Sequence, residues 1–161
     1  QHIPEEIPST LAAMVDQQVD MLLGRRDLRG YPWLKRVGNW GLSLWASLLS
    51  GYRYQDVECG FRILRVATLP DLIRFYTGHR YSCAQEISII TARRGWKINN
   101  RITTEVAYYR KGARHRDGII NLTMGLVAWV KVMTNWHYDL ATRIDTILNG
   151  VAEESNRRVA L

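Results

Sequence analysis

Arginines stand at the ends of the predicted helices and strands in this sequence. An arginine fork matches the oxygens of a phosphate in bidentate geometry, and loops on a rigid scaffold commonly carry function. A single surface arginine is more often a solvated charge, but three clusters at element boundaries favour a phosphate site. The arginines concerned are Arg25, Arg26, Arg29, Arg62, Arg110, Arg114 and Arg116.

Other catalytic patterns are missing from the sequence. It holds no P-loop, no nucleophile elbow and no HExxH zinc motif. Its four histidines are scattered, and Cys59 and Cys83 lack metal-binding spacing, so we expect two reduced thiols. Spacing alone therefore identifies no catalytic centre.

The composition indicates a folded domain with an anionic partner. The chain has 161 residues, of which 47% are hydrophobic and 23% charged, so it can bury a core and is not disordered as a whole. Its net charge of +7, from 22 Lys and Arg against 15 Asp and Glu, suits a nucleic acid, a nucleotide phosphate or an anionic lipid. The six Trp residues favour a membrane interface or stacking.

The elements that must position these arginines follow from apolar periodicity and from glycine and proline. Helical spacing predicts a helix after Pro4 and another over Trp33–Leu48, which Gly51 should end. A short buried strand is predicted at Val19–Leu23, stopping at Gly24. Further predicted elements are a strand at Phe61–Val66, helices near Leu69–Tyr76 and Ala84–Arg94, strands at Trp96–Ile98 and Ile102–Tyr109, and a helical remainder with a break near His137–Asp139.

One apolar segment bears on membranes. Residues Gly118 to Val130 carry no charge, but Lys131 interrupts the run before the roughly 20 apolar residues that a spanning helix needs. The spacing favours a helix that lies in the membrane interface or packs on the domain. An ordinary core helix is an open alternative, and a span is less favoured. The apolar stripe of this helix is Leu122, Leu126, Trp129, Met133 and Trp136.

The segment QDVECGFRILR, Gln55 to Arg65, resembles the D-x-x-C/S-G-F-R motif of family 2 glycosyltransferases, close to the dolichyl- and polyprenyl-phosphate sugar synthases. Other pieces resemble that family in the same order along residues 1–136. QHIPEEIP at the start is similar to the stretch that follows the family's DxD motif, and MLLGRR is similar to its strand ending in G-S-R. The remaining pieces are Leu34–Asp56, Glu86–Ile98 and Glu105–His115.

The resemblance implies an α/β fold of the GT-A type, a Rossmann-like mixed sheet with flanking helices. Residues 1–116 would form the C-terminal, acceptor-side part of that domain, and residues 117–161 a helical segment at the membrane interface or packed on the domain. The sequence contains no DxD, has Gly24-Arg25-Arg26 in place of G-S-R, and has Arg114-His115 in place of the late Ser-Lys. We therefore expect this chain by itself to lack a complete donor site.

The implied reaction is an inverting, metal-dependent transfer of a hexose from a nucleotide sugar to a polyprenyl phosphate. The implied cofactor is Mg²⁺ or Mn²⁺, with Gln1 at the metal, and the implied location is the cytoplasmic face of a membrane. Asp56 would orient the acceptor or the metal, unless it only caps the amides of Gly60 and Phe61. The other implied residues are Arg26, Arg36 and Arg110 for phosphate, with Arg114 as a second choice, and Glu58, Gly60, Phe61 and Arg62 around the acceptor.

Two other functions fit the same residues. One is a family 2 glycosyltransferase with a saccharide or other hydroxyl acceptor, in which Asp56 would be the base. The other is a basic, Trp-rich module that binds an anionic membrane or nucleic acid without catalysis. Nucleic acid is disfavoured as a partner, because the arginines are not interleaved with the aromatic residues of a single-strand-binding module.

Overall fold

A computed structural model describes residues 4–104, 106 and 115–136 of the chain. The described part is a mixed α/β structure around a three-stranded sheet in the order β2-β1-β3. The strands are β1 (Met21–Arg26), β2 (Arg62–Leu64) and β3 (Ile98–Thr104). The central strand β1 runs antiparallel to β2 and parallel to β3. This arrangement confirms the α/β class, while GT-A identity stays a prediction.

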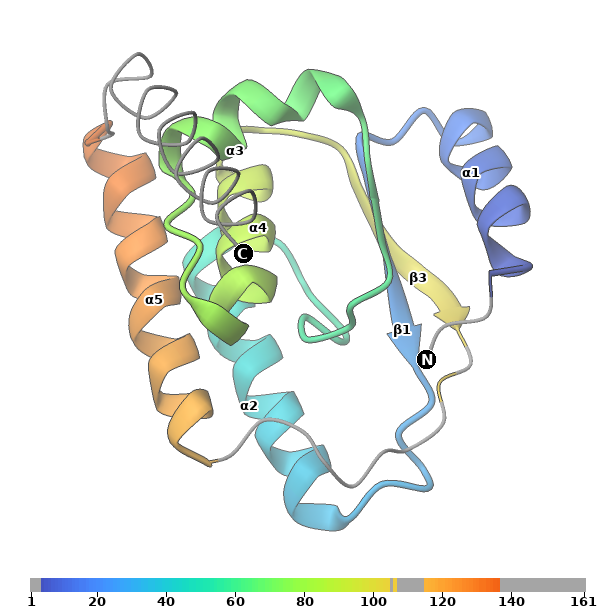
Figure 1. Ribbon diagram of the computed structural model, residues 1–161, viewed down its shortest axis with the longest axis horizontal. Coiled ribbons are helices and arrows are strands. Elements are labelled where there is room, and N and C mark those ends of the chain that lie inside the picture. Colours follow the sequence, from blue (N-terminus) through green and yellow to red (C-terminus); the bar gives the residue numbers. More distant parts are fainter. Residues whose placement is uncertain (1–3, 105, 107–114, 137–161) are drawn as a thin grey trace, which may run out of the picture.

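Helices cover both faces of the sheet. Helix α1 lies on one side, and α2, α4 and α5 lie together on the other (Figure 1). Within this second layer, α4 packs against both α2 and α5, and α2 also packs against α5. The helices are α1 (Glu6–Asp16), α2 (Trp33–Ser50), α3 (Leu69–Phe75), α4 (Cys83–Arg93) and α5 (His115–Thr134), with short 3₁₀ turns at Val66–Thr68 and Arg80–Ser82.

The core follows the alternation of side chains along β1. Met21 and Leu23 are fully buried in the main cluster, which includes Ile89 of α4, and Leu22 is fully buried with Met14 of α1. Because successive side chains of a strand point to opposite faces, one strand supplies both apolar layers. This explains why its sequence reads as an uninterrupted apolar run.

The predicted end of the first strand at Gly24 is wrong, because β1 continues through this glycine to Arg26. A Cβ atom at position 24 would lie 2.8 Å from Cγ2 of Thr104 and 3.3 Å from both Sγ of Cys59 and Cβ of Phe61. The glycine therefore marks a close approach inside the sheet and not a turn. Because the strand continues past this glycine, Arg26 belongs to the sheet.

The two strands predicted after Trp96 are one strand, β3, which includes both Asn99 and Asn100. Asn100 is buried, and its amide nitrogen donates to the backbone carbonyl of Arg53 at 2.7 Å. The pairing places Asn99 opposite Leu22 and Ile102 opposite Gly24, so β3 carries one extra residue at this point. The residues between the two predicted strands thus lie within one bulged strand.

Helix α2 has the predicted extent, and Gly51 ends it in the left-handed conformation with φ of 74°. Its apolar stripe, however, faces outward. The inward residues are small and polar, and Ser43, Ala46 and Ser50 are the buried ones. The exposed residues of the stripe are Trp33, Val37, Trp40, Leu44 and Leu48, with exposed fractions between 44% and 72%.

Helix α5 is buried on one side only. Ala128, Asn121 and Lys131 are buried, and Trp129 packs against the main core cluster. The other residues of its predicted stripe, Leu122, Leu126, Met133 and Trp136, are exposed. Among the residues that the structure describes, no helix is long and apolar enough to span a membrane.

Candidate functional site

A bidentate ion pair joins the end of β1 to the loop between α2 and β2. Nε of Arg26 donates to Oδ2 of Asp56 and Nη2 donates to Oδ1, both at 2.7 Å. The backbone N–H of Arg26 also donates to Oδ2, at 3.0 Å. Asp56 has a side-chain exposure of 1% against 19% for Arg26. The pair is therefore largely withdrawn from water, with only the arginine reaching the surface.

Asp56 stabilises the charged form of the Arg26 guanidinium. Burial alone would lower the pKa of Arg26, but the hydrogen bonds that Arg26 donates to Asp56 and the negative charge of Asp56 together outweigh burial and raise that pKa. Both carboxylate oxygens of Asp56 accept from Arg26, so the alternative in which Asp56 only caps the amides of Gly60 and Phe61 is wrong. Such geometry orients a guanidinium; it does not present a free base.

The inner face of α2 holds the loop that carries Asp56. The Ser43 hydroxyl accepts from the Val57 N–H at 3.0 Å, and the Ser47 hydroxyl accepts from the Tyr54 N–H at 2.9 Å. Buried backbone N–H groups need such partners when no strand supplies them. The serines therefore explain why α2 turns its polar side inward.

Arg62 holds the same loop from the other end. Its guanidinium donates to the carbonyls of Cys59 at 3.0 Å and Ala84 at 2.8 Å, and also to the carbonyl of Val57. Burial is the main influence on the pKa of Arg62 and lowers it. Arg62 was predicted to bind phosphate, but these contacts place it inside the fold as a support of the loop.

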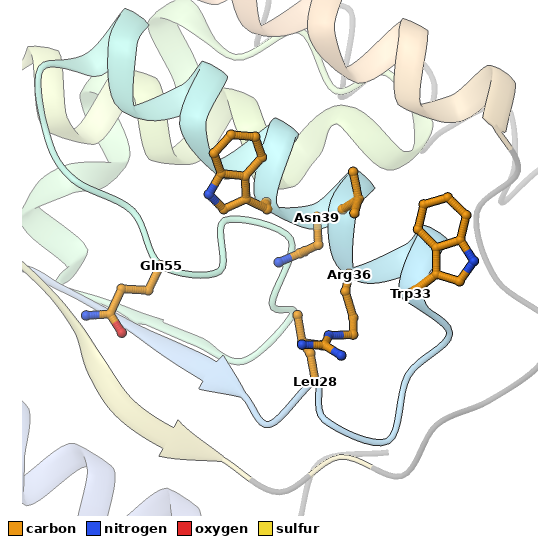
Figure 2. A pocket seen from close by; sticks show the side chains of 7 residues that line it. Leu28, Trp33, Arg36, Asn39 and Gln55 are labelled. Atoms are coloured by element: carbon orange, nitrogen blue, oxygen red, sulfur yellow. The ribbon is translucent and has the colours of Figure 1, made fainter.

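An open pocket lies over the first half of α2 (Figure 2). Its volume is about 410 Å³. Asn39 connects the pocket to the pair, because its Oδ1 accepts from Nη2 of Arg26 at 3.0 Å. The lining is mostly apolar, with one guanidinium, and consists of Leu28, Trp33, Arg36, Val37, Asn39, Trp40 and Gln55.

The opposite rim of the pocket is also anchored to the sheet. Oε1 of Gln55 accepts from Nη1 of Arg25 at 2.7 Å, and Nη2 of Arg25 donates to Oγ1 of Thr103 at 3.2 Å. Arg25 occupies the position where the resembling family has serine. It connects the loop to β3.

The structure brings three of the predicted residues together. Arg26 and Asp56 form the ion pair, and Arg36 lines the adjoining pocket. Phe61 is buried in the core, Gly60 next to it is exposed, and Glu58 lies among the helices on the inner side of the loop. Gln1, Arg110 and Arg114 lie outside the described residues, so their predicted roles stay predictions.

Asn39, Trp33 and Gln55 were not predicted as site residues. Asn39 follows Arg36 by one helical turn, so helical spacing places the two on one face. Trp33 belongs to the stripe recognised in the sequence, but periodicity does not reveal that the stripe lines an open pocket. Gln55 directly precedes Asp56, and nothing in its local sequence marks it as part of a pocket wall.

The described residues offer no ligand set for a metal ion. Among them no group of three or more His, Cys, Asp and Glu side chains gathers in one place. Asp56, beside the pocket, has both oxygens paired with Arg26. The predicted Mg²⁺ or Mn²⁺ at Gln1 stays a prediction, and we derive no step through a metal.

Comparison with known proteins gives distant, partial matches. The chain is 29% identical over 98 residues to a UDP-N-acetylglucosamine--dolichyl-phosphate N-acetylglucosaminyltransferase of Methanococcus voltae, which covers 58% of this chain and 39% of that protein. Two uncharacterized proteins of Methanocaldococcus jannaschii match as well. One is 32% identical over 104 residues, covering 61% of this chain and 44% of the relative, and the other is 27% identical over 103 residues, covering 61% and 42%.

The match thus spans less than half the length of each of these relatives. No family model matches the chain. No solved structure gives a significant match. What these findings support is a distant similarity to a glycosyltransferase that acts on dolichyl phosphate.

Proposed function

We propose that this chain is the acceptor-binding part of a glycosyltransferase that moves a hexose from a nucleotide sugar to a polyprenyl phosphate. The observation that carries the proposal is the pocket over α2, where an arginine stands among apolar side chains next to the Arg26–Asp56 pair. A lipid phosphate has the same two parts, an anionic head and an apolar chain. The distant similarity to a dolichyl-phosphate glycosyltransferase supports the same substrate class.

In this proposal Arg36 binds the acceptor phosphate, and Trp33 and Trp40 contact the first units of the lipid. An oxygen of the phosphate attacks C1 of the sugar, and the bond from C1 to the nucleoside diphosphate breaks with inversion. A phosphate is already ionised near neutral pH and needs little help from a base, so positioned cations lower the barrier. Arg26, oriented by Asp56, is the second cation. The proposed metal would belong with Gln1 and the donor.

We further propose that the exposed apolar face of α2 lies on the cytoplasmic surface of a membrane. Trp33 and Trp40 are 72% and 65% exposed, and tryptophan favours the membrane–water interface. Lys35 and Arg36 on the same helix would each contribute about 1 kcal/mol near an anionic leaflet. A helix on the membrane would receive a lipid acceptor directly at the pocket.

The test of the acceptor site uses the full-length protein with a panel of nucleotide sugars and a polyprenyl phosphate. Arg36→Ala should lower kcat/KM by about 100-fold, the loss of one charge-assisted contact to phosphate. Arg101→Ala is the matched control, because Arg101 is exposed on β3 and does not line the pocket. Transfer to a saccharide but not to the lipid phosphate would contradict the proposed acceptor.

The membrane contact is tested by co-sedimentation with anionic liposomes. Trp33→Glu with Trp40→Glu should abolish sedimentation and leave the circular dichroism spectrum unchanged, because both side chains are exposed. Salt should release the wild-type protein only in part, since it screens the charges and not the apolar contact. Full sedimentation of the folded double variant would contradict a membrane contact through α2.

A further inference from the structure

Glu58 lies in the same loop as Asp56, but its carboxylate points into the helical layer. Its Oε1 accepts from Nε2 of Gln85 on α4 at 3.1 Å, and its Oε2 accepts from Nδ2 of Asn121 on α5 at 3.2 Å. Nε2 of Gln85 also donates to the Leu42 carbonyl of α2 at 3.2 Å. The carboxyl group of Glu58 therefore connects α4 and α5 to the loop directly, and α2 through Gln85.

The partners of Glu58 are neutral. Gln85 and Asn121 are 0% and 2% exposed, and among the described residues no lysine or arginine forms an ion pair with Glu58. Arg62, its nearest charged neighbour along the loop, gives its hydrogen bonds to backbone carbonyls and the Ser88 hydroxyl. Glu58 is partly exposed, but a carboxylate that is mostly withdrawn from water and has no paired cation is costly, and the usual outcome is that it binds a proton.

The oxygen atoms of these two amides also lack a hydrogen-bond donor. Oε1 of Gln85 and Oδ1 of Asn121 are buried and have no hydrogen-bond partner in the described structure. Nε2 of Gln85 has a second acceptor that fixes its orientation, whereas the contact found for Nδ2 of Asn121 is Glu58 itself. Rotating the Asn121 amide by half a turn would place Oδ1 against Glu58. One proton on Glu58 would then satisfy that oxygen.

We propose that Glu58 is held as a neutral carboxylic acid that donates to Asn121 and accepts from Gln85, and that it is a positioning residue for the loop carrying Asp56. The positioning role rests on the proposed glycosyltransferase function, whereas the neutral state does not. Val57 alone separates the two acids, so a shift of Glu58 displaces the Asp56–Arg26 pair beside the pocket. The loop is then held to the helices by the hydrogen bonds of a neutral acid and not by an ion pair.

The electrostatic surroundings agree with this state. Burial raises the pKa of Glu58, and the charge of Asp56 adds to the rise, while the Gln85 hydrogen bond and the charges of Arg62 and Arg26 oppose it. The groups that face Glu58 from α4 and α5 are the neutral amides, with the buried Asp117 one turn before Asn121. α2 contributes the Leu42 carbonyl to the same contact.

The raised pKa sets the sign of the pH dependence. The stabilising contribution of Glu58 is fully present below its ordinary pKa of 4.5 and is lost as the pH rises through the higher value of the folded protein. Glu58→Gln carries no titrating group. The difference in stability between this variant and the wild type should therefore grow in favour of the variant as the pH rises.

The control is Glu86→Gln on α4. Glu86 is fully buried, and its Oε2 accepts from the Thr77 N–H and its Oε1 from the Ser82 hydroxyl, each at 2.6 Å. An amide at position 86 has only one oxygen to accept with and carries no charge, so the charge-assisted bond from the Thr77 N–H weakens and the Ser82 hydroxyl must give its proton to the His79 carbonyl instead. It should therefore destabilise the protein, while Glu58→Gln should not, although both variants make the same chemical change.

Three measurements on the full-length protein test the proposal. Near pH 7 the infrared spectrum of the wild type should contain the C=O band of a protonated carboxyl, which Glu58→Gln removes and Glu86→Gln keeps. Urea unfolding between about pH 5 and about pH 8 should give the pH trend described above. Glu58→Ala should lower kcat at least about tenfold, and Glu58→Gln should restore most of it.

Each outcome tests one part of the proposal. A missing acid band, together with a loss of stability in Glu58→Gln as large as in Glu86→Gln, would overturn the neutral state. An unchanged kcat in Glu58→Ala would overturn the positioning role. If the wild type transfers no sugar under any condition, the proposed function fails, while the infrared and urea measurements still decide the state of Glu58.

Discussion

Asp56 and Glu58 are two acids of one loop whose surroundings are opposite. Asp56 faces the end of the sheet, where the Arg26 guanidinium occupies both of its oxygens. Glu58 faces the helical layer, where two neutral amides contact its oxygens. The same type of group is thus paired with a cation on one side of the loop and with buried amides on the other.

The comparison shows how a loop can carry a charged and an uncharged acid side by side. What decides is the element that each side chain meets, since both acids are withdrawn from water. The arginine side leads to the pocket, where a phosphate would need positive charge. The amide side leads to the core, where an uncompensated charge would cost stability. Each of the following variants should affect one side of this contrast more than the other.

The largest effect is expected from Asp56→Asn. Removing one partner of a buried ion pair costs about 3 kcal/mol, because it leaves Arg26 without its counter-charge. The free energy of unfolding, measured in urea, should fall by about this amount, and turnover should fall with it. Asp27→Asn is the control, since the Asp27–Arg29 pair is exposed and its loss should not change stability measurably.

The double variant Asp56→Asn with Arg26→Gln tests whether the two residues act as a pair. Two amides can pair with each other, so the double variant should recover part of the lost stability but none of the turnover. A double variant as unstable as the sum of the single changes would show that the two residues act independently. In that case the ion pair would not be the reason for burying Asp56.

A smaller but broader effect is expected from Arg62→Lys. A lysine has no fork to serve the carbonyls of Val57, Cys59 and Ala84 together, and each unsatisfied carbonyl costs about 1 to 3 kcal/mol unless water reaches it. We expect a loss of about 2 kcal/mol in urea unfolding. Because Arg62 holds the loop as a whole, both the turnover and the infrared band of Glu58 should change. A change in only one would show that the two acids are positioned separately.

The smallest effect is expected from Asn39→Ala. This change removes one hydrogen bond to Nη2 of Arg26 and leaves the contacts with Asp56 in place. The cost to stability should be about 1 kcal/mol, and KM for the lipid acceptor should rise more than kcat falls. Titration of turnover with polyprenyl phosphate measures this. An unaltered KM would show that the Arg26–Asp56 pair does not affect acceptor binding in the pocket.

The sequence predicted the extents of the helices but left open which face each helix buries. The apolar spacing and Gly51 located α2 correctly, and the structure shows that its stripe faces outward, because the inward side is needed for serine contacts with the loop. Periodicity reports that a helix has two faces, and not which one the protein buries. Asn99 and Asn100 fall between the two strands predicted from the sequence, but tertiary contacts keep them within β3.

The residues of the candidate site could also be predicted only in part. The resemblance drew attention to Arg26, Arg36 and Asp56, and the structure places these residues at or beside one pocket. The destination of Glu58 could not be predicted, because its partners Gln85 and Asn121 come from helices 27 and 63 residues further along the chain. Nor could Arg62 be separated from the other arginines, since its role depends on backbone carbonyls that only the folded loop brings together.

The close packing around Gly24 also determines how this sequence can evolve. Because a methyl group at position 24 would meet Cγ2 of Thr104, each substitution at one position depends on the residue at the other. Thr104→Ser removes that methyl and keeps the hydroxyl that donates to Oε2 of Glu6 at 2.5 Å. In a library randomised at both positions and selected for folded protein, alanine at position 24 should be recovered together with serine at position 104. The two sites should therefore covary, although 80 residues of chain separate them.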